Sequence, residues 1–444
     1  MHSCDLEIWI ERQSAQSAAA MERAISATHL CRRREGFRQT IRPAAGSVLA
    51  SPVISDWDPE PDYFFHWLRD SAVVMRTVAE LMEDGADATE RRHWQHHFER
   101  FVQFSLHLAE LDGAAAVAAP SYQLARAHPQ AKFLRPEPEL SALRGDALLG
   151  EPRFNPDGTI DIFRWSRPQY DGPALRAIAG VRYLASGGPR SDELERLLRL
   201  DLDFTIRHAC EPSIGPWEEP DESGWHYYVV LVQFAALVHA RLSGFGWCKR
   251  MSAGRHWQEA EQKLRIGLER HWSVQNQIMM AIWPCSADDS DDLLDAATLL
   301  AVWDADLPEG PHSITDKRLQ RTQAAIERLF ARELPINHQR AHAPAIGRSR
   351  RDRYFGGGAW YPTTLASAGL YYRLAKRAAE NRTALIARGD AVMQTLRELT
   401  PADGALSEQI DRVTGEQSSA PHLTWSYAAF VSTARLRRKV LALA

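Results

Sequence analysis

Hydrophobic positions recur with a period near 3.6 along most of the chain, which is the spacing of amphipathic α-helices, whereas alternating strand-like runs are short and few. Twelve helices are predicted on this basis, at residues 15–29, 69–83, 90–110, 172–186, 192–209, 223–243, 253–272, 292–303, 315–331, 361–379, 382–398 and 422–437. Connectors rich in Gly, Pro and Asp, which favour turns, separate these helices. The pattern therefore predicts an all-α fold.

The connectors alternate in composition. Aromatic residues, arginines and carboxylates precede every even-numbered helix, in DPEPDYFFHWLRD, RWSRPQYDG, GPWEEPDESG, WPCSADDSDD, RDRYFGGGAWYP and LSEQIDRVTGEQSSAPHLT. Odd-numbered helices follow plainer segments such as EDGADATE and GGPRSDE. Even helices also have the more uniformly apolar sequences, for example YYVVLVQFAALVHA, as expected of helices that are buried on several sides.

A ring of six helical hairpins explains this alternation. Odd helices would lie outside, even helices would line the centre, and the polar and aromatic connectors would meet at one end. We expect a single (α/α)6 barrel that takes up residues 1–444 as one domain, with residues 1–46 forming an N-terminal helix and a connector. An open helical solenoid has similar periodicity and remains the alternative.

Composition narrows the range of functions. The chain is 45% hydrophobic and 25% charged, typical of a globular protein, and its net charge of -4 gives no reason to bind nucleic acid or an anionic membrane. It has no apolar run of the roughly 18 residues that span a bilayer. Asp5, Glu7 and Glu11 interrupt any N-terminal signal peptide, and five scattered cysteines show neither metal nor disulfide spacing. We therefore expect a cytoplasmic protein without a metal site.

A pair of glutamates stands between two prolines in the sixth connector. Pro220 biases Glu219 towards extended geometry, in which Glu218 and Glu219 point to different parts of one cleft. Close carboxylates beside Trp217 disfavour ionisation of one of them, as a proton donor requires. The alternative is a helix start over residues 221–223 with Ser223 as N-cap, which leaves residues 217–219 unexplained.

Further polar residues belong to the same predicted rim. Glu408 is far from Glu218 in sequence, and a carboxylate pair across a pocket is the arrangement of glycoside hydrolysis, although acidic residues in polar loops are usually only solvated. Arg69 and Asp70 can form paired hydrogen bonds to neighbouring sugar hydroxyls, unless Asp70 only caps a helix. Arg167 and Asp171 offer a similar pair of polar groups. Flat apolar walls for a sugar ring could come from Tyr63, Trp67, Trp165, Trp217 and Trp360, although most aromatic residues are core.

An acidic run indicates a competing class of helical enzyme. DDSDD, Asp288–Asp292, has the spacing of the Mg-pyrophosphate motif of terpene cyclases, and hard cations favour clustered carboxylates. Those enzymes carry a second metal motif on a later helix, which is not found in this sequence. Acidic residues also stabilise a helix N-terminus, so capping of the predicted 292–303 helix is the preferred interpretation.

Five ordered blocks resemble the glycoside hydrolase family that holds fungal and bacterial glucoamylases. The likeness runs from about residue 47, GSVLASPVISDWDPEPDYFFHWLRDSA, to about residue 436. It includes GEPRFNPDG, RPQYDGPALRA, WEE, YFGGGAWYPTTLASAGLYY and SEQIDRVTGEQSSAPHLTWSYA. The resemblance implies an (α/α)6 barrel without a cofactor that removes glucose from the nonreducing ends of short α-glucans with inversion, releasing β-glucose.

The resemblance also implies residue roles. Glu218 resembles the general acid and Glu408 the general base. Arg69 and Asp70 resemble the pair that holds the nonreducing glucose, Arg348 a sugar-binding arginine, Trp165 the indole beside the acid, and Glu219 a contact to the next sugar. The complete expected substrate-binding set is Tyr63, Trp67, Arg69, Asp70, Trp165, Arg167, Asp171, Trp217, Glu219, Arg348 and Trp360.

Two departures from the family pattern leave the glycosidic linkage open. Gly215-Pro216 replaces Asp-Leu before WEE, and SRR replaces a Tyr-Pro-Glu run before Asp352, both near the expected place of a second sugar. The family includes α-1,4, α-1,6 (isomaltose or dextran type) and trehalose substrates, and a non-catalytic sugar-binding barrel is a further alternative. No separate starch-binding domain fits in the chain, which favours short oligosaccharides as substrate.

Overall fold

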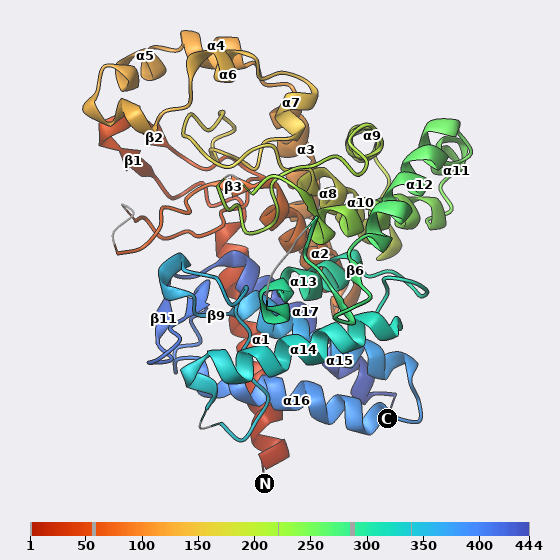
Figure 1. The fold of residues 1–444 in the computed structure, drawn as a ribbon. Helices are drawn as coiled ribbons and strands as arrows, with labels where there is room; N and C mark the ends of the chain where they lie inside the picture. Colours follow the sequence, from red (N-terminus) through yellow and green to blue (C-terminus); the bar gives the residue numbers. More distant parts are fainter. Residues whose placement is uncertain (1, 56–58, 221, 285–288, 339, 444) are drawn as a thin grey trace.

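The computed structural model describes residues 2–55, 59–220, 222–284, 289–338 and 340–443. Within these residues six helices, which Figure 1 labels, pack in succession as an inner ring: α2 (Leu68–Asp84), α8 (Asp171–Ala185), α10 (Tyr227–Leu242), α13 (Ala297–Ala305), α15 (Tyr361–Arg377) and α17 (Thr424–Leu441). Each helix packs against the next in this order, and α17 returns to α2. This closure makes the fold an (α/α)6 barrel and excludes the open solenoid.

The described residues supply six outer helices that cover the ring: α1 (His2–Ala24), α3 (Ala88–Ala109), α9 (Asp192–Arg207), α12 (Arg255–Glu269), α14 (Lys317–Glu333) and α16 (Arg382–Leu399). α1 packs on α17, α3 on α2, α9 on α8, α12 on α10 and α16 on α15. Outer helix α14 buries one face through Leu319, Ile326 and Phe330, whereas inner helix α10 buries every residue from Tyr227 to Val238. The predicted alternation of outer and inner helices is confirmed.

Three helix starts differ from the prediction by more than two residues. Helix α1 begins at His2 and not at residue 15, because Leu6, Trp9 and Ile10 recur at helical spacing and are buried. Helix α10 begins at Tyr227 and not at residue 223, because a short strand precedes it, so Ser223 is not its N-cap. Helix α13 begins at Ala297 and not at residue 292, after a separate 3-10 turn.

Short helices occupy several connectors. The remaining α-helices of the described chain are α4 (Gly113–Ala118), α5 (Pro120–Arg126), α6 (Glu137–Ser141), α7 (Asp146–Leu149) and α11 (Gly246–Ser252). The 3-10 helices are η1 (Glu35–Phe37), η2 (Pro129–Phe133), η3 (Ser290–Leu293), η4 (Pro335–Asn337) and η5 (Tyr354–Gly356). Such elements have too few residues to show a helical period, so none was predicted. No helix in the described ranges combines the length and apolar character needed to cross a membrane.

Short antiparallel strands fix where the connectors enter the inner helices. The pairs are β1 (Arg32–Arg34) with β2 (Gln39–Ile41), β3 (His66–Trp67) with β4 (Arg153–Phe154), β5 (Trp225–His226) with β8 (Ile282–Trp283), and β6 (Trp272–Ser273) with β7 (Ile278–Met279). A three-stranded sheet contains β9 (Ala359–Trp360), β10 (Gln409–Ile410) and β11 (Gln417–Ser418). Strands β3, β5 and β9 run directly into α2, α10 and α15, so the side chains around them are held at one end of the barrel.

Candidate active site

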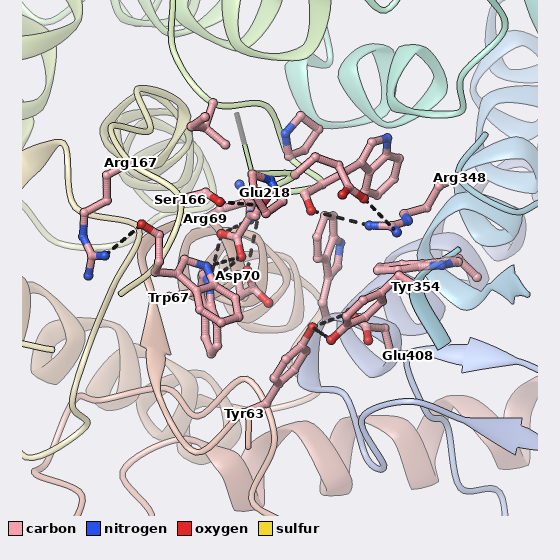
Figure 2. A pocket seen from close by; sticks show the side chains of 18 of the residues that line it. Tyr63, Trp67, Arg69, Asp70, Ser166, Arg167, Glu218, Arg348, Tyr354 and Glu408 are labelled. Atoms are coloured by element: carbon pink, nitrogen blue, oxygen red, sulfur yellow. Dashed lines mark hydrogen bonds and ion pairs between the residues drawn. The ribbon is translucent and has the colours of Figure 1, made fainter. Parts of the chain in front are cut away.

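A pocket of about 820 Å³ opens where the connectors enter the inner helices (Figure 2). Its walls come from segments far apart in sequence, and every predicted site residue except Asp171 lines it. The lining residues include Tyr63, Trp67, Arg69, Asp70, Trp165, Arg167, Trp217, Glu218, Glu219, Arg348, Tyr354, Trp360, Glu408 and Trp425. The barrel thus brings together the connectors that the sequence marked as unusual.

Glu218 lies at a turn of the connector that precedes α10. Its φ is 58°, in the left-handed region that few residues other than glycine adopt and that is enriched at functional sites. The Ser166 hydroxyl donates to the Glu218 carbonyl at 2.7 Å and holds the turn. The Glu218 carboxylate meets Arg69 and the Glu219 carboxylate meets Arg348, so the two side chains point to different parts of the pocket, as predicted, with Glu218 in a left-handed and not an extended conformation.

Four donors surround the Glu218 carboxylate. The indole N–H groups of Trp67 and Trp165 donate to it at 3.0 and 2.7 Å. Arg69 Nη2 and Gln169 Nε2 each donate to Oε1 at 2.9 Å. Trp67 and Arg69 stand where β3 runs into α2, and Trp165 and Gln169 stand on the connector that follows β4, so the position of the carboxylate depends on the packing of β3 against β4. Trp67 and Trp165 therefore hold this carboxylate through their edges as well as lining the pocket.

Glu408 is buried in the pocket wall beside β10. Its carboxylate accepts hydrogen bonds from the Ser419 hydroxyl and, at 3.2 Å, from the Tyr63 hydroxyl. The Tyr63 hydroxyl also lies 2.8 Å from that of Tyr354. Burial raises the pKa of Glu408 to about 7, against the opposing effects of Ser419, Arg348 and Tyr63, which favour the charged form. Glu408 is therefore a carboxyl that exchanges its proton near neutral pH.

Arg69 and Asp70 begin α2 at the base of the pocket. Arg69 Nη1 donates to Asp171 at 2.8 Å and to Gln169 at 3.0 Å. Asp70 lies 3.8 Å from Arg69 Nε, and burial, together with the negative charges of Glu218 and Asp171, raises the pKa of Asp70 to about 7 despite the opposing effect of Arg69. Asp171 is buried behind Arg69 and does not line the pocket, so its prediction as a substrate contact is corrected: it positions Arg69.

Arg348 forms the opposite side of the pocket. Its guanidinium pairs with Asp352, with Nε donating at 2.8 Å, and Nη2 lies 3.1 Å from Glu219. The guanidinium also stacks against the rings of Trp217 and Trp360, at 5.6 and 5.2 Å from their centroids. The ion pairs and the stacking together hold the Arg348 guanidinium in one orientation. A guanidinium held in this way is suited to donate hydrogen bonds to sugar oxygens.

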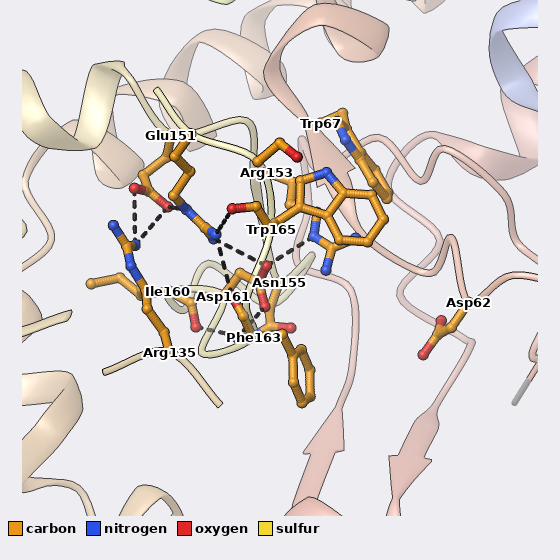
Figure 3. A network of polar contacts seen from close by, with 12 residues as sticks. Asp62, Trp67, Arg135, Glu151, Arg153, Asn155, Ile160, Asp161, Phe163 and Trp165 are labelled. Atoms are coloured by element: carbon orange, nitrogen blue, oxygen red, sulfur yellow. Dashed lines mark hydrogen bonds and ion pairs between the residues drawn. The ribbon is translucent and has the colours of Figure 1, made fainter. Parts of the chain in front are cut away.

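Arg167 is held mainly by protein groups. Its Nε donates to Glu151 at 2.7 Å and its Nη2 to Asp161 at 3.3 Å. Asp161 also accepts from Arg153, whose guanidinium lies 3.7 Å from the ring centroid of Trp165 (Figure 3). Arg167 thus belongs to an ion-pair network behind the indoles. Because Arg167 also lines the pocket, its contact to sugar hydroxyls stays a prediction.

A family comparison agrees with this geometry. The family model described as glycosyl hydrolases family 15 matches residues 37–388 and 369–435, which is most of the chain. The chain belongs to glycosyl hydrolase family 15. It is therefore a glycoside hydrolase, and the matched residues include every connector that contributes to the pocket.

Relatives named as glucoamylases match most of this chain and a smaller share of their own length. Glucoamylase-1 of Schizophyllum commune is 27% identical over 443 residues, which cover 89% of this chain and 69% of the relative. The intracellular sporulation-specific glucoamylase of Saccharomyces cerevisiae is 26% identical, over 89% of this chain and 79% of the relative.

Solved structures of the family have the same fold. The glucoamylase of Saccharomycopsis fibuligera superposes with a TM-score of 0.75 at 23% identity, over 99% of this chain and 96% of that one. The family 15 glucoamylase of Hypocrea jecorina gives a TM-score of 0.77 at 22% identity, over 98% and 73%.

Several residues of this family 15 pocket were not predicted. Tyr354 and Trp425 line the cavity, and Ser419 and Gln169 bond the two glutamates. Asp295 accepts the Trp217 indole N–H at 2.9 Å, and burial raises the pKa of Asp295 to about 7. Gln169, Tyr354, Ser419 and Trp425 stand inside the motifs that mark the rim or carry the family resemblance, so motif membership was the available signal for them. Asp295 lies outside these motifs and acts through Trp217, which only the fold brings near it.

The acidic run serves a different purpose from the predicted cap of α13. Asp289 and Asp292 pair with Arg350 and Arg351, the last at 2.7 Å, and Asp289 caps only the short helix η3. Asp291 pairs with Arg332 at 2.6 Å. Asp288 lies outside the described residues. The run is therefore held by ion pairs to Arg350 and Arg351 of the unusual SRR segment and to Arg332 of α14.

Proposed function

We propose that this family 15 hydrolase is an inverting, exo-acting α-glucosidase that releases β-glucose from the nonreducing ends of short α-1,4-glucans. The observation that carries the proposal is the placement of Glu218 and Glu408 in one pocket, from separate connectors and with different partners. The names of the relatives, which are glucoamylases, support the substrate class.

Glu218 is the proposed general acid. Its proton passes to the glycosidic oxygen as the bond to the leaving sugar breaks, and negative charge then develops on its carboxylate. Arg69 and the indoles of Trp67 and Trp165 already point their N–H groups at this carboxylate. Donors that are in place before the reaction stabilise the developing charge without reorganisation.

Glu408 is the proposed general base. It takes a proton from a water molecule that attacks the anomeric carbon from the side opposite the leaving sugar, which inverts the configuration. A base with a pKa near the working pH combines ionisation with proton affinity, and the pKa of about 7 supports this role. An inverting pair needs carboxyl groups about 6.5–9.5 Å apart, because the water lies between them.

The nonreducing glucose would bind between the two carboxylates. Asp70 and Arg348 offer polar contacts to its hydroxyls, and Trp67, Trp165 and Trp360 offer apolar walls. The neighbouring sugar would meet Glu219, which the ion pair with Arg348 holds at the mouth of the site.

The test follows the anomer of the product. Proton NMR would record hydrolysis of maltotriose, isomaltotriose and trehalose by the parent protein, Glu408→Gln and Glu416→Gln. We expect early β-glucose from maltotriose, a loss of about 10²–10⁴-fold in kcat for Glu408→Gln, and no change for Glu416→Gln, which is on the same connector and outside the pocket.

The other outcomes contradict separate parts of the proposal. Early α-glucose would reject inversion and keep the substrate class. Preferred hydrolysis of isomaltotriose or trehalose would replace the α-1,4 linkage. Binding of sugars without turnover by the parent protein would reject the enzymatic role of this pocket.

A further inference from the structure

Two histidines and a glutamate meet on the outer layer of the barrel, and none of them lines the active-site pocket. His93 and His97 are one turn apart on α3, and Glu22 is in the last turn of α1. His93 Nε2 lies 2.8 Å from Glu22 Oε1, and His97 Nε2 lies 3.7 Å from the same oxygen. The three potential ligand atoms all lie within 4.8 Å of one another.

This donor set has the chemistry of a zinc-type site. Two imidazole nitrogens and one carboxylate oxygen are ligands that Zn²⁺ accepts at about 2.0–2.2 Å. Ligand atoms at that radius around a tetrahedral ion are about 3–4 Å apart, so the present spacing needs only small side-chain rotations. Histidines at positions i and i+4 share one face of a helix, as in helical zinc motifs. Ca²⁺ and Mg²⁺ prefer sites made of oxygen atoms.

The surroundings also favour a cation. Glu22 is close to the C-terminal end of α1, where the helix dipole stabilises positive charge. The His97 side chain is only 15% exposed, whereas Glu22 and His93 are 38% and 46% exposed. An ion would therefore have one ligand fixed by packing and an open path from solvent, with room for water as a fourth ligand.

We propose that Glu22, His93 and His97 bind one divalent transition-metal ion of the zinc type, which clamps the end of α1 to α3. Beyond α1 the chain is tied to the pocket, because Leu49 N donates to the Ala24 carbonyl and Ser51 N to the Tyr63 carbonyl. The ion thus stabilises the N-terminal segment that supports the Tyr63 connector. The site is structural, and it does not depend on the proposed glucosidase reaction.

Metal titration tests the site directly. Protein without a polyhistidine tag, stripped with EDTA and dialysed, is titrated with ZnCl2 and separately with MgCl2 by calorimetry at pH 7.5. We expect one Zn²⁺ per chain, no heat with Mg²⁺, and a Tm about 2–4 °C higher at a hundredfold excess of Zn²⁺ over its Kd. Co²⁺ should give the visible absorption of a four-coordinate ion.

Matched variants locate the ion. His97→Ala should weaken Zn²⁺ binding at least tenfold and abolish the rise in Tm, and His93→Ala should repeat this loss. His96→Ala is the control, because His96 is exposed on the same helix and outside the ligand group. All three variants should hydrolyse maltotriose at the parent rate. Absence of Zn²⁺ binding, or equal losses in His96→Ala and His97→Ala, would overturn the proposal.

Discussion

Among the side chains around Glu408, Ser419 opposes most strongly the effect of burial, which is what raises the pKa of Glu408. Ser419 donates to one carboxylate oxygen and Tyr63 to the other. Both favour the charged form, whereas burial favours the neutral form and raises the pKa to about 7. Because the proposed base must be ionised, kcat/KM should fall as the pH drops below about 7.

Ser419→Ala should move this acidic limb to higher pH. Loss of the donor destabilises the carboxylate, so the pKa of Glu408 rises further, by about one unit for a hydrogen bond to a charged group. The measurement is kcat/KM for maltotriose from pH 4 to about pH 9. Ser418→Ala is the control, because the Ser418 hydroxyl is buried without a hydrogen-bond partner in the described chain. A limb that stays in place would show that Glu408 does not control it.

Asp171→Asn should lower stability more than it changes substrate contacts. The substitution removes the charge that pairs with buried Arg69 at 2.8 Å, and breaking a buried ion pair costs about 3–5 kcal/mol in free energy of unfolding. Urea unfolding at pH 7 measures the loss. Asp192→Asn, at the exposed first residue of α9, should change little. Unchanged stability with a raised KM would restore the direct role of Asp171 in substrate binding.

The close packing of two inner helices, α13 and α15, depends on a glycine. Gly369 on α15 faces Trp303 on α13, and a Cβ atom at Gly369 would lie 2.3 Å from the indole. The Trp303 side chain is buried in the ring and has no room to withdraw. This glycine therefore sets how closely two inner helices approach.

Gly369→Ala should reduce the free energy of unfolding by about 1–3 kcal/mol, because the added methyl group overpacks the contact between α13 and α15. Equilibrium unfolding in urea gives the value. Gly246→Ala is a matched control at the first residue of α11, where the nearest atom would be 3.8 Å away. It should be neutral or stabilise by up to about 1 kcal/mol. Equal effects of both variants would contradict the packing argument.

At the scale of the whole molecule, the burial of carboxyl groups in and around the pocket makes the stability of the fold depend on pH. The pKa values of Asp70, Asp295 and Glu408 all rise to about 7 on folding, mainly because burial disfavours the charged form. Each group stabilises the fold fully below its unfolded pKa and loses that contribution as the pH rises through about 7. These three buried carboxyl groups, of which Glu408 is the proposed base, therefore lower the stability of the fold at alkaline pH.

Glu408→Gln should accordingly stabilise the protein at pH 8 and leave it unchanged near pH 4. The rise of the Glu408 pKa from 4.5 to about 7 corresponds to about 3 kcal/mol, which the neutral amide avoids. Urea unfolding at both pH values gives the comparison, with Glu416→Gln as control. A gain of equal size at both pH values would mean that packing and not ionisation causes it.

Much of the fold could be predicted because the hydrophobic period of a long helix is visible in its own segment of sequence. The starts of α2, α8 and α9 were predicted to within one residue, since each follows a clear change from connector to periodic sequence. The start of α1 was missed because its acidic residues masked the buried positions Leu6, Trp9 and Ile10. The start of α10 was missed because Trp225 pairs as a strand with Trp283, far along the chain, and this pairing competes with helix formation.

The sequence alone determined the alternating helices, the family and most pocket residues, because apolar spacing and motif order are properties of a linear chain. Only the tertiary structure decided which charges meet. It placed Asp171 behind Arg69, drew Arg167 into an ion-pair network, and set Ser419 against Glu408. It also joined Glu22 to His93 and His97 across two helices. The charge interactions of these side chains depend on the distances between them and on their burial, and both are set only when the helices pack into the closed ring.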